Sequence, residues 1–577
     1  MASLSVPPKP TILGFSRSSS CPFVSRKPLS LPTKPIVHSG VLRCRASAEN
    51  LNDHDDASQK NGASRRGLLV GLGGLYGTAA GLSMNRNAAF GAPIQPPQLS
   101  QCGPADLPSG ADPVNCCPPV TSKIIDFKPP PASSPLRVRP AAHLVDSEYI
   151  AKYTKAVQLM RNLPSSDPRN FTQQSNVHCA YCDASYDQPG FPGVEIQIHQ
   201  SWLFFPWHRF YLYFHERILG KLIGDDTFAL PFWNWDNPAG MYLPSIYTPT
   251  TSSLYNALRD PAHQPPTIVD LDFGGSETTD SGQKLIDDNL AIMYRQVISG
   301  GTLPELFLGA TYRAGDPPNP GAGTLENAPH GTVHIWTGDS RQPNREDMGI
   351  LYSAARDPIF FAHHSNIDRL WNVWKSLGGQ RQDFTDSDWL DAAFLFYDEN
   401  AQLVKVKVRD CLDMTSLRYA YQDVDNPWIR AKPARGGTGR PVVPAVEPTF
   451  PLTLSTGNVS VTVKRPPTTG RSADANEVLV VGGIEFDSSK FTKFDVFVNA
   501  SSDAVLRPAV AECAGSFTHV PHLHAGGSGP KIVKTNLKLC ITELLDDIGA
   551  SADDSVVVTL VPRVGSVTIA AVSTVLI

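Results

Sequence analysis

The stretch from His199 to Glu216 (HQSWLFFPWHRFYLYFHE) constrains the chain most, because it sets three histidines among eight aromatic side chains. From Trp207 to Leu219 the apolar residues recur at helical spacing, which predicts that His208 lies on a buried helix face. His199 precedes His208 by nine residues and would face the opposite side of a continuous helix, which turns about 100° per residue. The two histidines can bind one ion only if His199 lies off the helix, upstream of Pro206.

One buried histidine is more often a hydrogen-bonded core residue than a metal ligand, but further histidines here favour a metal. The spacing of His330 and His334 in HGTVH places both imidazoles on one helix face. Gly331 stands where the H-E-x-x-H motif of zinc hydrolases has glutamate. We therefore expect two three-histidine groups. These are His178, His199 and His208, and His330 and His334 with either His363 or His364. Imidazole ligands alone suit zinc, copper, iron or nickel.

Length and charge limit the class of protein. The 577 residues suffice for two or three domains. A net charge of −5 without a basic stripe gives no sign of nucleic-acid binding. The only long, weakly charged apolar run, from Gly67 to Leu82, is too short and too rich in glycine for a good transmembrane helix.

The N-terminus has the composition of targeting segments rather than of a fold. Met1 to Ser47 contains no Asp or Glu and is rich in Ser, Pro, Arg and Lys, which is typical of a plastid transit peptide. Arg65-Arg66, an apolar run and Ala89-Phe90-Gly91 resemble a second export signal. Two tandem signals predict import into the chloroplast and then the thylakoid lumen, with a mature chain from Ala92. The alternative is a disordered N-terminus with a fortuitous apolar patch.

Five cysteines crowd the start of the predicted mature chain. Adjacent Cys116 and Cys117 cannot easily bond each other, so each is expected to reach elsewhere. Their turn-rich, aperiodic segment needs covalent anchoring. A zinc site is the competing interpretation, but the C-x-x-C of Cys179 and Cys182 has no second such motif to pair with.

Two regions of different pattern follow. Helices are expected at Val145–Leu163, Gly282–Val297, Pro329–Trp336 and Asp357–Leu377, and a loop at Asn170–Pro192. In the last of these helices Asp368 is expected to bond an imidazole or Arg369. The basic, proline-studded run AKPARGGTGRPVVPAVEPTFP reads as a flexible linker. Alternating strand-like runs beyond it predict an antiparallel sandwich.

These motifs together resemble the plant polyphenol oxidases (catechol oxidase/tyrosinase family), which hold a dinuclear type-3 copper centre. HQSWLFFPWHRFYLYFHE resembles the first copper motif of the family, and DPIFFAHHSNID resembles the second, in which the second His is the ligand. The resemblance implies two coppers, one on His178, His199 and His208 and the other on His330, His334 and His364. It leaves His215 and His363 outside the copper ligands. The implied fold is a mainly α catalytic domain, with a four-helix bundle holding the dicopper site, plus a C-terminal antiparallel β-sandwich.

The resemblance extends to covalent links and domain limits. HCAYC resembles the cross-link segment of the family, which implies a thioether between Cys182 and His199. The start APIQPPQLSQCGPADLP implies disulfides Cys102–Cys117 and Cys116–Cys179. YAYQDVDNPW and KFDVF match markers of the two domains. We expect targeting signals at 1–91, a catalytic domain at 92–430, a cleavable linker at 431–450, and a shielding domain at 451–577 that keeps the enzyme latent.

Three positions at the implied site refine the expected activity. Gly331 stands where members active on monophenols often carry Asn, while Glu326 matches the glutamate that orients a basic water. Leu351 replaces a bulky Phe over the second copper and implies a more open entrance. The expectation is oxidation of o-diphenols to o-quinones with reduction of O2 to water, and weaker monophenol hydroxylation.

Other functions stay open at this point. A dioxygen carrier of the haemocyanin type would use similar histidines without turnover, and a zinc hydrolase or a plastid storage or scaffold protein is also possible. His519, His522 and His524 in HVPHLH form either an auxiliary metal site or, as we expect, a solvated surface cluster. The expected partners are small phenols and O2, without nucleic acid or stable membrane insertion. The sequence does not give the oligomeric state.

Overall fold

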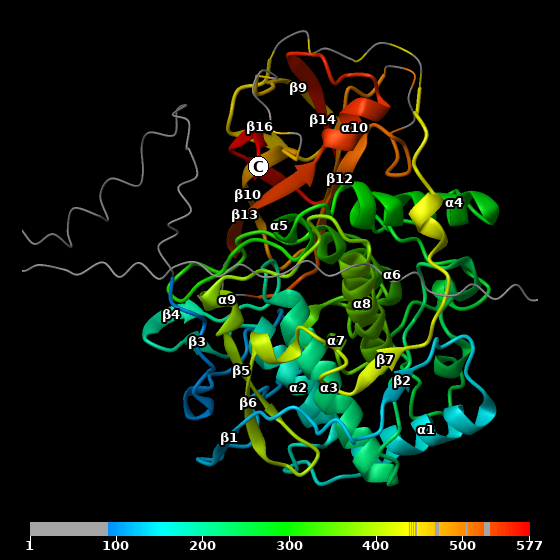
Figure 1. Cartoon of the computed structure of the whole chain (residues 1–577), viewed down its shortest axis with the longest axis vertical. Coiled ribbons are helices and arrows are strands. Elements are labelled where there is room, and N and C mark those ends of the chain that lie inside the picture. The colour runs from blue at the N-terminus through cyan, green and yellow to red at the C-terminus, as the bar shows by residue number, and fades with distance from the viewer. Residues whose placement is uncertain are drawn as a thin grey trace, which may run out of the picture. The chain divides into compact units, whose positions relative to one another are not determined.

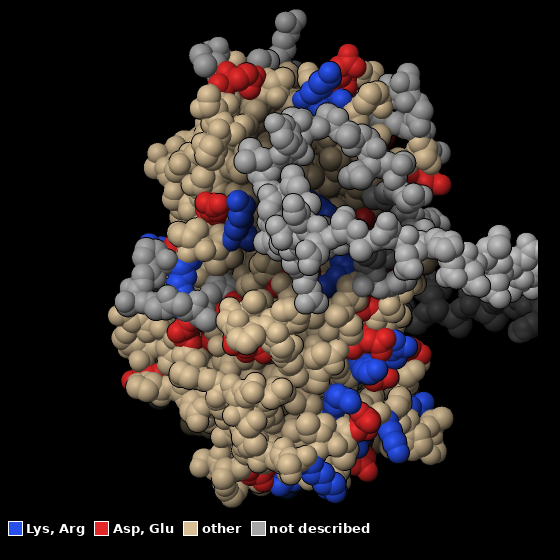
Figure 2. Space-filling view, turned by 90° about the vertical axis from the view of Figure 1, so that its left-hand side faces the viewer, with Lys and Arg blue, Asp and Glu red and all other residues tan. Residues whose placement is uncertain are grey.

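A computed structural model of the chain describes most residues from Gly91 onward (Figure 1). The described residues are 91–437, 439, 441, 444, 447–467, 472, 474–501, 503, 506–523 and 531–577. The predicted targeting signals up to residue 90, six residues of the predicted linker (438, 440, 442, 443, 445 and 446) and His524 lie outside them. In this part of the chain, no helix combines the length and apolar character that spanning a membrane requires. On the face in Figure 2, basic and acidic side chains are interspersed.

Helices form the centre of the first region. They are α1 (Ser147–Arg161), α2 (Phe171–Cys182), α3 (Phe204–Ile223), α4 (Gln283–Tyr294), α5 (Pro304–Phe307), α6 (Thr332–Thr337), α7 (Leu351–Ala354), α8 (Ile359–Ser376) and α9 (Ser387–Leu390). Helix α3 packs against α8 and α1, and α2 packs against α7. Their apolar side chains form one hydrophobic core around the aromatic stretch that the sequence singled out.

Helix α2 corrects the expectation of a loop at Asn170–Pro192. Asn170 caps it by accepting the N–H of Thr172 at 2.8 Å. The sequence FTQQSNVHCAYC shows no apolar stripe because the helix is buried on nearly every side. Several of its polar side chains are hydrogen-bonded inside the protein; for example, Ser175 Oγ donates to the carbonyl of Ala355 at 2.8 Å. Burial all round therefore hid this helix from a periodicity argument.

Helix α3 follows the predicted pattern, with one shift at its start. It begins at Phe204, so Pro206 lies inside the first turn, where a missing N–H costs no helical hydrogen bond. His199 lies outside the helix, as the angular argument required. Gly224 ends the helix in the left-handed conformation, with φ of 69°.

The HGTVH segment is less regular than the predicted helix. A π-helical turn, η6 (Glu326–Gly331), contains a non-helical Ala328 and precedes α6. His330 and His334 still lie one turn apart, with their ring centroids separated by 4.7 Å.

Small sheets that the sequence analysis did not predict brace the helices. Strand β1 (Ile124–Asp126) pairs with β6 (Leu403–Lys407), which pairs with β5 (Ala393–Tyr397). Strand β2 (Arg137–Arg139) pairs with β7 (Tyr419–Tyr421), and β3 (Asp187–Gln188) with β4 (Phe191–Glu195). Two disulfides, Cys102–Cys117 and Cys116–Cys179, anchor the N-terminal segment, the second of them directly to α2. These are the pairs that the resemblance implied, and they exclude a zinc site at Cys179.

The C-terminal region contains two antiparallel sheets around a shared core. One has the order β13-β10-β15-β8 with β16 also on β10, and the other has the order β12-β11-β14-β9. The strands are β8 (Leu452–Leu454), β9 (Val459–Lys464), β10 (Glu477–Asp487), β11 (Thr492–Val498), β12 (Cys513–His519), β13 (Ile532–Cys540), β14 (Ser555–Val564), β15 (Val567–Ile569) and β16 (Ala571–Leu576). The expected succession of strands is interrupted once, because Thr542–Asp547 forms helix α10.

A buried ion-pair network joins α3, α8 and the small sheets. Asp368 accepts Arg209 Nε at 2.5 Å and Arg139 Nη1 at 3.2 Å, while Glu216 accepts Arg139 Nε at 2.8 Å. The prediction that Asp368 bonds an imidazole or Arg369 is therefore wrong. Arg369 pairs instead with Asp236 at 2.5 Å. The nearby arginines hold the pKa of Asp368 below its ordinary value despite its burial.

Candidate metal centre

The first histidine group combines three elements. His178 comes from α2, His199 from the segment before α3, and His208 from α3 itself. Their ring centroids lie 5.2 to 5.8 Å apart, and none of the side chains is more than 3% exposed. One ring nitrogen from each lies within 4.8 Å of one from each of the others.

The second group holds four histidines rather than the three expected. They are His330, His334, His363 and His364, with ring nitrogens that also lie within 4.8 Å of one another. The two groups face each other directly, since the rings of His208 and His364 stack with a centroid distance of 4.2 Å. The structure thus brings all six predicted ligands together and adds His363. His215 stays apart, with its ring stacked on Phe361 at 3.6 Å.

Main-chain carbonyls orient most of these rings. The Nδ1 atoms of four histidines lie 2.8 to 3.1 Å from a carbonyl oxygen. The pairs are His178 with Leu351, His208 with Phe204, His330 with Glu326, and His334 with Met348. Because a carbonyl only accepts, each of these Nδ1 atoms carries the proton and each Nε2 keeps a lone pair. His199 Nδ1 lies 3.3 Å from the side-chain oxygen of Gln197.

These lone pairs converge in a dry interior. Among the described residues, Nε2 of His178, His199, His208 and His330 has no hydrogen-bond partner. Nε2 of His334 and of His364 lie 3.2 Å from each other. Burial lowers the pKa of His178 to about 3 and of His334 to about 4, so these rings are neutral at pH 7. Neutral imidazoles with bare nitrogens in one cluster are the donors that a transition-metal site requires.

His363 differs from its neighbours. The indole nitrogen of Trp235 lies 3.1 Å from its Nδ1. An indole N–H only donates, so Nδ1 of His363 is the acceptor and its proton lies on Nε2. A protonated nitrogen offers no lone pair to a metal. The tautomer of His363 is thus opposite to that of His178, His208, His330 and His334.

Glu326 lies beside the clustered imidazoles. Its Oε1 accepts the main-chain N–H of Gln200 at 2.5 Å, and its Oε2 has no partner among the described residues. Gln200 presents that N–H from a left-handed conformation with φ of 53°. Burial raises the pKa of Glu326 well above its ordinary value.

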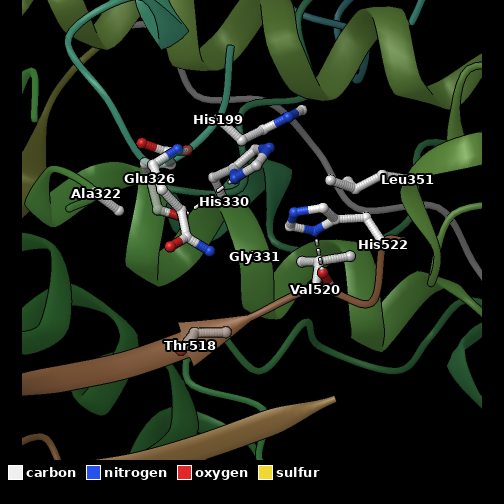
Figure 3. Close-up of a pocket in the computed structure, with 10 residues that line it drawn as sticks. His199, Ala322, Glu326, His330, Gly331, Leu351, Thr518, Val520 and His522 are labelled. Atoms are coloured by element: carbon white, nitrogen blue, oxygen red, sulfur yellow. Dashed lines mark hydrogen bonds between the residues drawn. The ribbon is translucent and has the colours of Figure 1, made fainter. Parts of the chain in front are cut away.

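A small cavity lies beside the histidines, and both regions of the chain line it (Figure 3). His199, His330, Glu326 and Leu351 come from the helical region. Thr518, Val520 and His522 come from the C-terminal region and close the other side. The cavity measures about 20 Å³, enough for one water molecule but not for a phenol. Leu351 and Gly331 both line this cavity, where C-terminal residues face them instead of an open entrance.

The HVPHLH segment corrects a further expectation. His519 and His522 are each only 1% exposed, so they do not form a solvated surface cluster. His519 Nδ1 lies 3.1 Å from Gln200 Nε2, and its Nε2 lies 2.8 Å from the carbonyl of Ser488. No described residues outside the two histidine groups form a further potential metal cluster. Sequence reasoning did not place Thr518, Val520 or His522 at the site, because pairing between distant regions leaves no local pattern.

Comparison with known proteins agrees with this architecture. The common central domain of tyrosinase matches residues 168–377, the polyphenol oxidase middle domain matches 383–434, and the chloroplastic polyphenol oxidase C-terminal domain matches 450–576. A chloroplastic polyphenol oxidase of Malus domestica is 53% identical over 99% of this chain and 98% of its own length. One from Vitis vinifera is 50% identical over 97% and 94%.

A solved structure gives the same result for the fold. Latent apple tyrosinase is 55% identical, covers 79% of this chain and 100% of its own, and superposes with a TM-score of 0.75. The fold and the match of the central domain place the chain in the tyrosinase class of enzymes. Within that class, the chain belongs to the plant polyphenol oxidase family.

Proposed function

We propose that the chain oxidises o-diphenols to o-quinones at a dinuclear copper centre, with O2 as the electron acceptor. The observation that carries the proposal is the convergence of buried imidazoles in two facing groups. Nε2 of His178, His199, His208 and His330 has no partner among the described residues, and Nε2 of His334 and of His364 lie 3.2 Å apart. Neither group contains a carboxylate or a thiolate. A set of imidazoles alone suits copper, and the family membership of the chain favours copper over the other candidates. Rapid oxygen uptake with catechol would separate this activity from a dioxygen carrier.

The proposed ligands are His178, His199 and His208 for one copper and His330, His334 and His364 for the other. The tautomer of His363 supports its exclusion, since Trp235 occupies its Nδ1 and its Nε2 carries the proton. When bound, the two coppers supply the redox chemistry and the Lewis acidity. The chain itself holds the imidazoles in place through main-chain carbonyls and excludes water with aromatic side chains.

A pair of adjacent substitutions tests the ligand assignment. His364→Phe should lose one of the two coppers and nearly all catechol oxidation, because phenylalanine has no ring nitrogen to bind the metal. His363→Phe should keep both coppers. Metal analysis of the purified mature proteins measures both. Full copper occupancy in His364→Phe, or loss of a copper in His363→Phe, would reverse the assignment.

A thioether between Cys182 and His199 is the second part of the proposal. The side chain of Gln197 bridges the two residues: its Nε2 donates to the carbonyl of Cys182 at 3.0 Å and its Oε1 accepts the N–H of His199 at 2.9 Å. Cys182 is buried and not part of a disulfide, and burial raises the pKa of its thiol. Such a bond would fix a proposed ligand that stands off the helix and lacks the main-chain carbonyl contact that four of the other histidines have.

The mass of the reduced protein tests this bond. With both disulfides reduced, the mature chain should stay two hydrogens lighter than its fully thiol form. Cys182→Ser should remove the difference, whereas Cys411→Ser, at another buried free cysteine, should keep it. An active wild-type enzyme whose Cys182 reacts with an alkylating reagent after unfolding would contradict the proposal.

We further propose that o-diphenols are preferred to monophenols. A monophenol must lose its proton before it binds copper, and Glu326 with a bound water is the available base. Gly331 offers no side-chain amide to help hold that water. In the closed chain a Cβ at position 331 would come within 3.0 Å of Thr518 Cγ2. The base therefore has to be tested with the C-terminal region removed.

Gly331→Asn in linker-cleaved enzyme should raise monophenol turnover relative to diphenol turnover severalfold, because its amide can hold the water on Glu326. Gly331→Ala is the matched control, since it adds the Cβ without the amide and should leave the ratio near the wild-type value. Parallel assays of a monophenol and its o-diphenol give the ratio. An unchanged ratio in Gly331→Asn would show that the basic water does not limit the reaction.

The last part of the proposal is latency, in which a C-terminal domain at 451–577 shields the catalytic domain at 92–430. A cleavable linker at 431–450 joins the two domains, and targeting signals occupy 1–91. Val520 and its neighbours fill the space that a phenol would need. Main-chain contact reinforces the closure, since the N–H of Leu351 donates to the carbonyl of Pro521 at 3.1 Å. The chloroplastic names of the relatives support a plastid location, and the tandem signals support the thylakoid lumen.

A buried cation also joins the two regions. Lys493, in the KFDVF motif, lies 2.8 Å from Asp272 of the helical region and 2.6 Å from Asp495 of its own strand. Its side chain is 1% exposed. Removing one partner of a buried pair leaves an uncompensated charge and is strongly destabilising, unlike the loss of an exposed pair.

Two changes should therefore raise the catechol oxidation of the full-length mature chain severalfold. The first is cleavage within residues 431–450, and the second is Lys493→Met, which leaves Asp272 and Asp495 without their shared cation. Lys490→Met is the control, because Lys490 is exposed and pairs with Asp487 on the surface. Equal rates for the full-length and cleaved forms would show that the C-terminal region is not a lid.

A further inference from the structure

The aromatic turn from Pro231 to Pro244 has no part in the function proposed so far, yet it is tied to α8 beside the histidine pair. The N–H of Trp233 donates to the carbonyl of Ala362 at 2.9 Å. Asp236 accepts Asn366 Nδ2 at 2.8 Å and Arg369 Nη2 at 2.5 Å. These bonds fix the turn on both sides of His363. Trp235, between them, is fully buried.

Distance alone does not keep His363 away from a metal. A ring nitrogen of His363 lies within 4.8 Å of a ring nitrogen of each of the other three histidines in its group. Its ring lies parallel to that of His330, with centroids 5.5 Å apart and an interplanar angle of 11°. The ring of His334 meets it nearly edge-on at 5.1 Å. His363 thus belongs geometrically to the second group.

The hydrogen bond from Trp235 distinguishes His363 from the other histidines of its group. The indole donates to Nδ1 of His363, so the proton lies on Nε2, which has no partner among the described residues. His330 and His334 have the opposite arrangement, because carbonyls accept from their Nδ1 atoms. To bind a metal through Nε2, His363 would have to move its proton to Nδ1. That would leave a fully buried indole N–H without an acceptor, which is costly.

We propose that Trp235 is a positioning residue that keeps His363 out of the coordination sphere of the second copper. The second site then has three imidazole ligands and an open position where a phenol can bind, instead of four imidazoles. This inference rests on the proposed dicopper site. In this proposal the buried aromatic turn has a specific role, which is to fix the tautomer of His363.

The test uses the mature full-length chain with ¹⁵N-labelled histidine, loaded with Cu(I), which is diamagnetic. In wild type, nitrogen NMR should show six of the seven clustered imidazoles bound through Nε2, and one with its proton on Nε2 and an unprotonated, hydrogen-bonded Nδ1. The spectrum of His363→Phe should lack that one and keep six bound rings with two coppers.

Trp235→Phe is the decisive variant, because phenylalanine retains an aromatic ring and removes the donor. Seven bound imidazoles are expected, with tighter retention of copper against a Cu(I) chelator and a loss of catechol turnover, since the open position is filled. The double variant Trp235→Phe/His363→Phe should return to six bound rings. Six bound rings in Trp235→Phe with two coppers present would overturn the proposal.

The outcomes separate the two levels of the argument. Loss of a copper in His363→Phe would mean that His363 is a native ligand, so the proposed ligand set itself would fail. If Trp235→Phe does not fold, the wild-type spectrum still decides, because a proton on Nδ1 of His363 would overturn the proposal and one on Nε2 would support it.

Discussion

The structure depends on a set of histidine ring nitrogens whose lone pairs no described residue satisfies with a hydrogen bond. Polar nitrogens buried without partners are costly, and here several lie within 4.8 Å of one another. At His178, His208, His330 and His334 the Nδ1–H is donated to a main-chain carbonyl, which directs Nε2 toward the other histidines. Under the proposed function the stability of the centre and its chemistry have one origin, because the nitrogens that are costly without partners are those proposed to bind copper.

Buried ion pairs hold the helices that carry those nitrogens. Asp368 on α8 accepts a hydrogen bond from Arg209 on α3. Arg209 directly follows the proposed ligand His208, and Asp368 lies one helical turn beyond the proposed ligand His364. Desolvating such charges is expensive, and the tyrosine hydroxyls of β7 help to satisfy the carboxylate. Such pairs contribute more to the register between the two helices than to net stability. Register is what a ligand set needs, since a small slide between α3 and α8 would separate His208 from His364.

Sequence predicted the parts of this arrangement that have a local period. The helical face of α3, the off-helix place of His199 and the pairing of His330 with His334 all followed from spacing. Helix α2 was missed because it is buried on every side and has no polar face to reveal a period. The partner of Asp368 and the tautomer of His363 were also beyond reach. Both depend on residues more than one hundred positions away, Arg209 and Trp235, which no local pattern connects to α8.

The C-terminal region is hydrogen-bonded to residues beside the clustered histidines and not to their Nε2 atoms. Leu351 receives His178 Nδ1–H at its carbonyl and donates its own N–H to Pro521 of the C-terminal region. Gln200 likewise donates its main-chain N–H to Glu326 and contacts His519 through its side chain. Neither bond involves a coordinating nitrogen. Under the proposed latency, removing the C-terminal region would break no hydrogen bond of the clustered imidazole rings, because their partners all lie in the helical region. A lid built in this way would close the cavity to phenols without using the nitrogens that are proposed to bind copper.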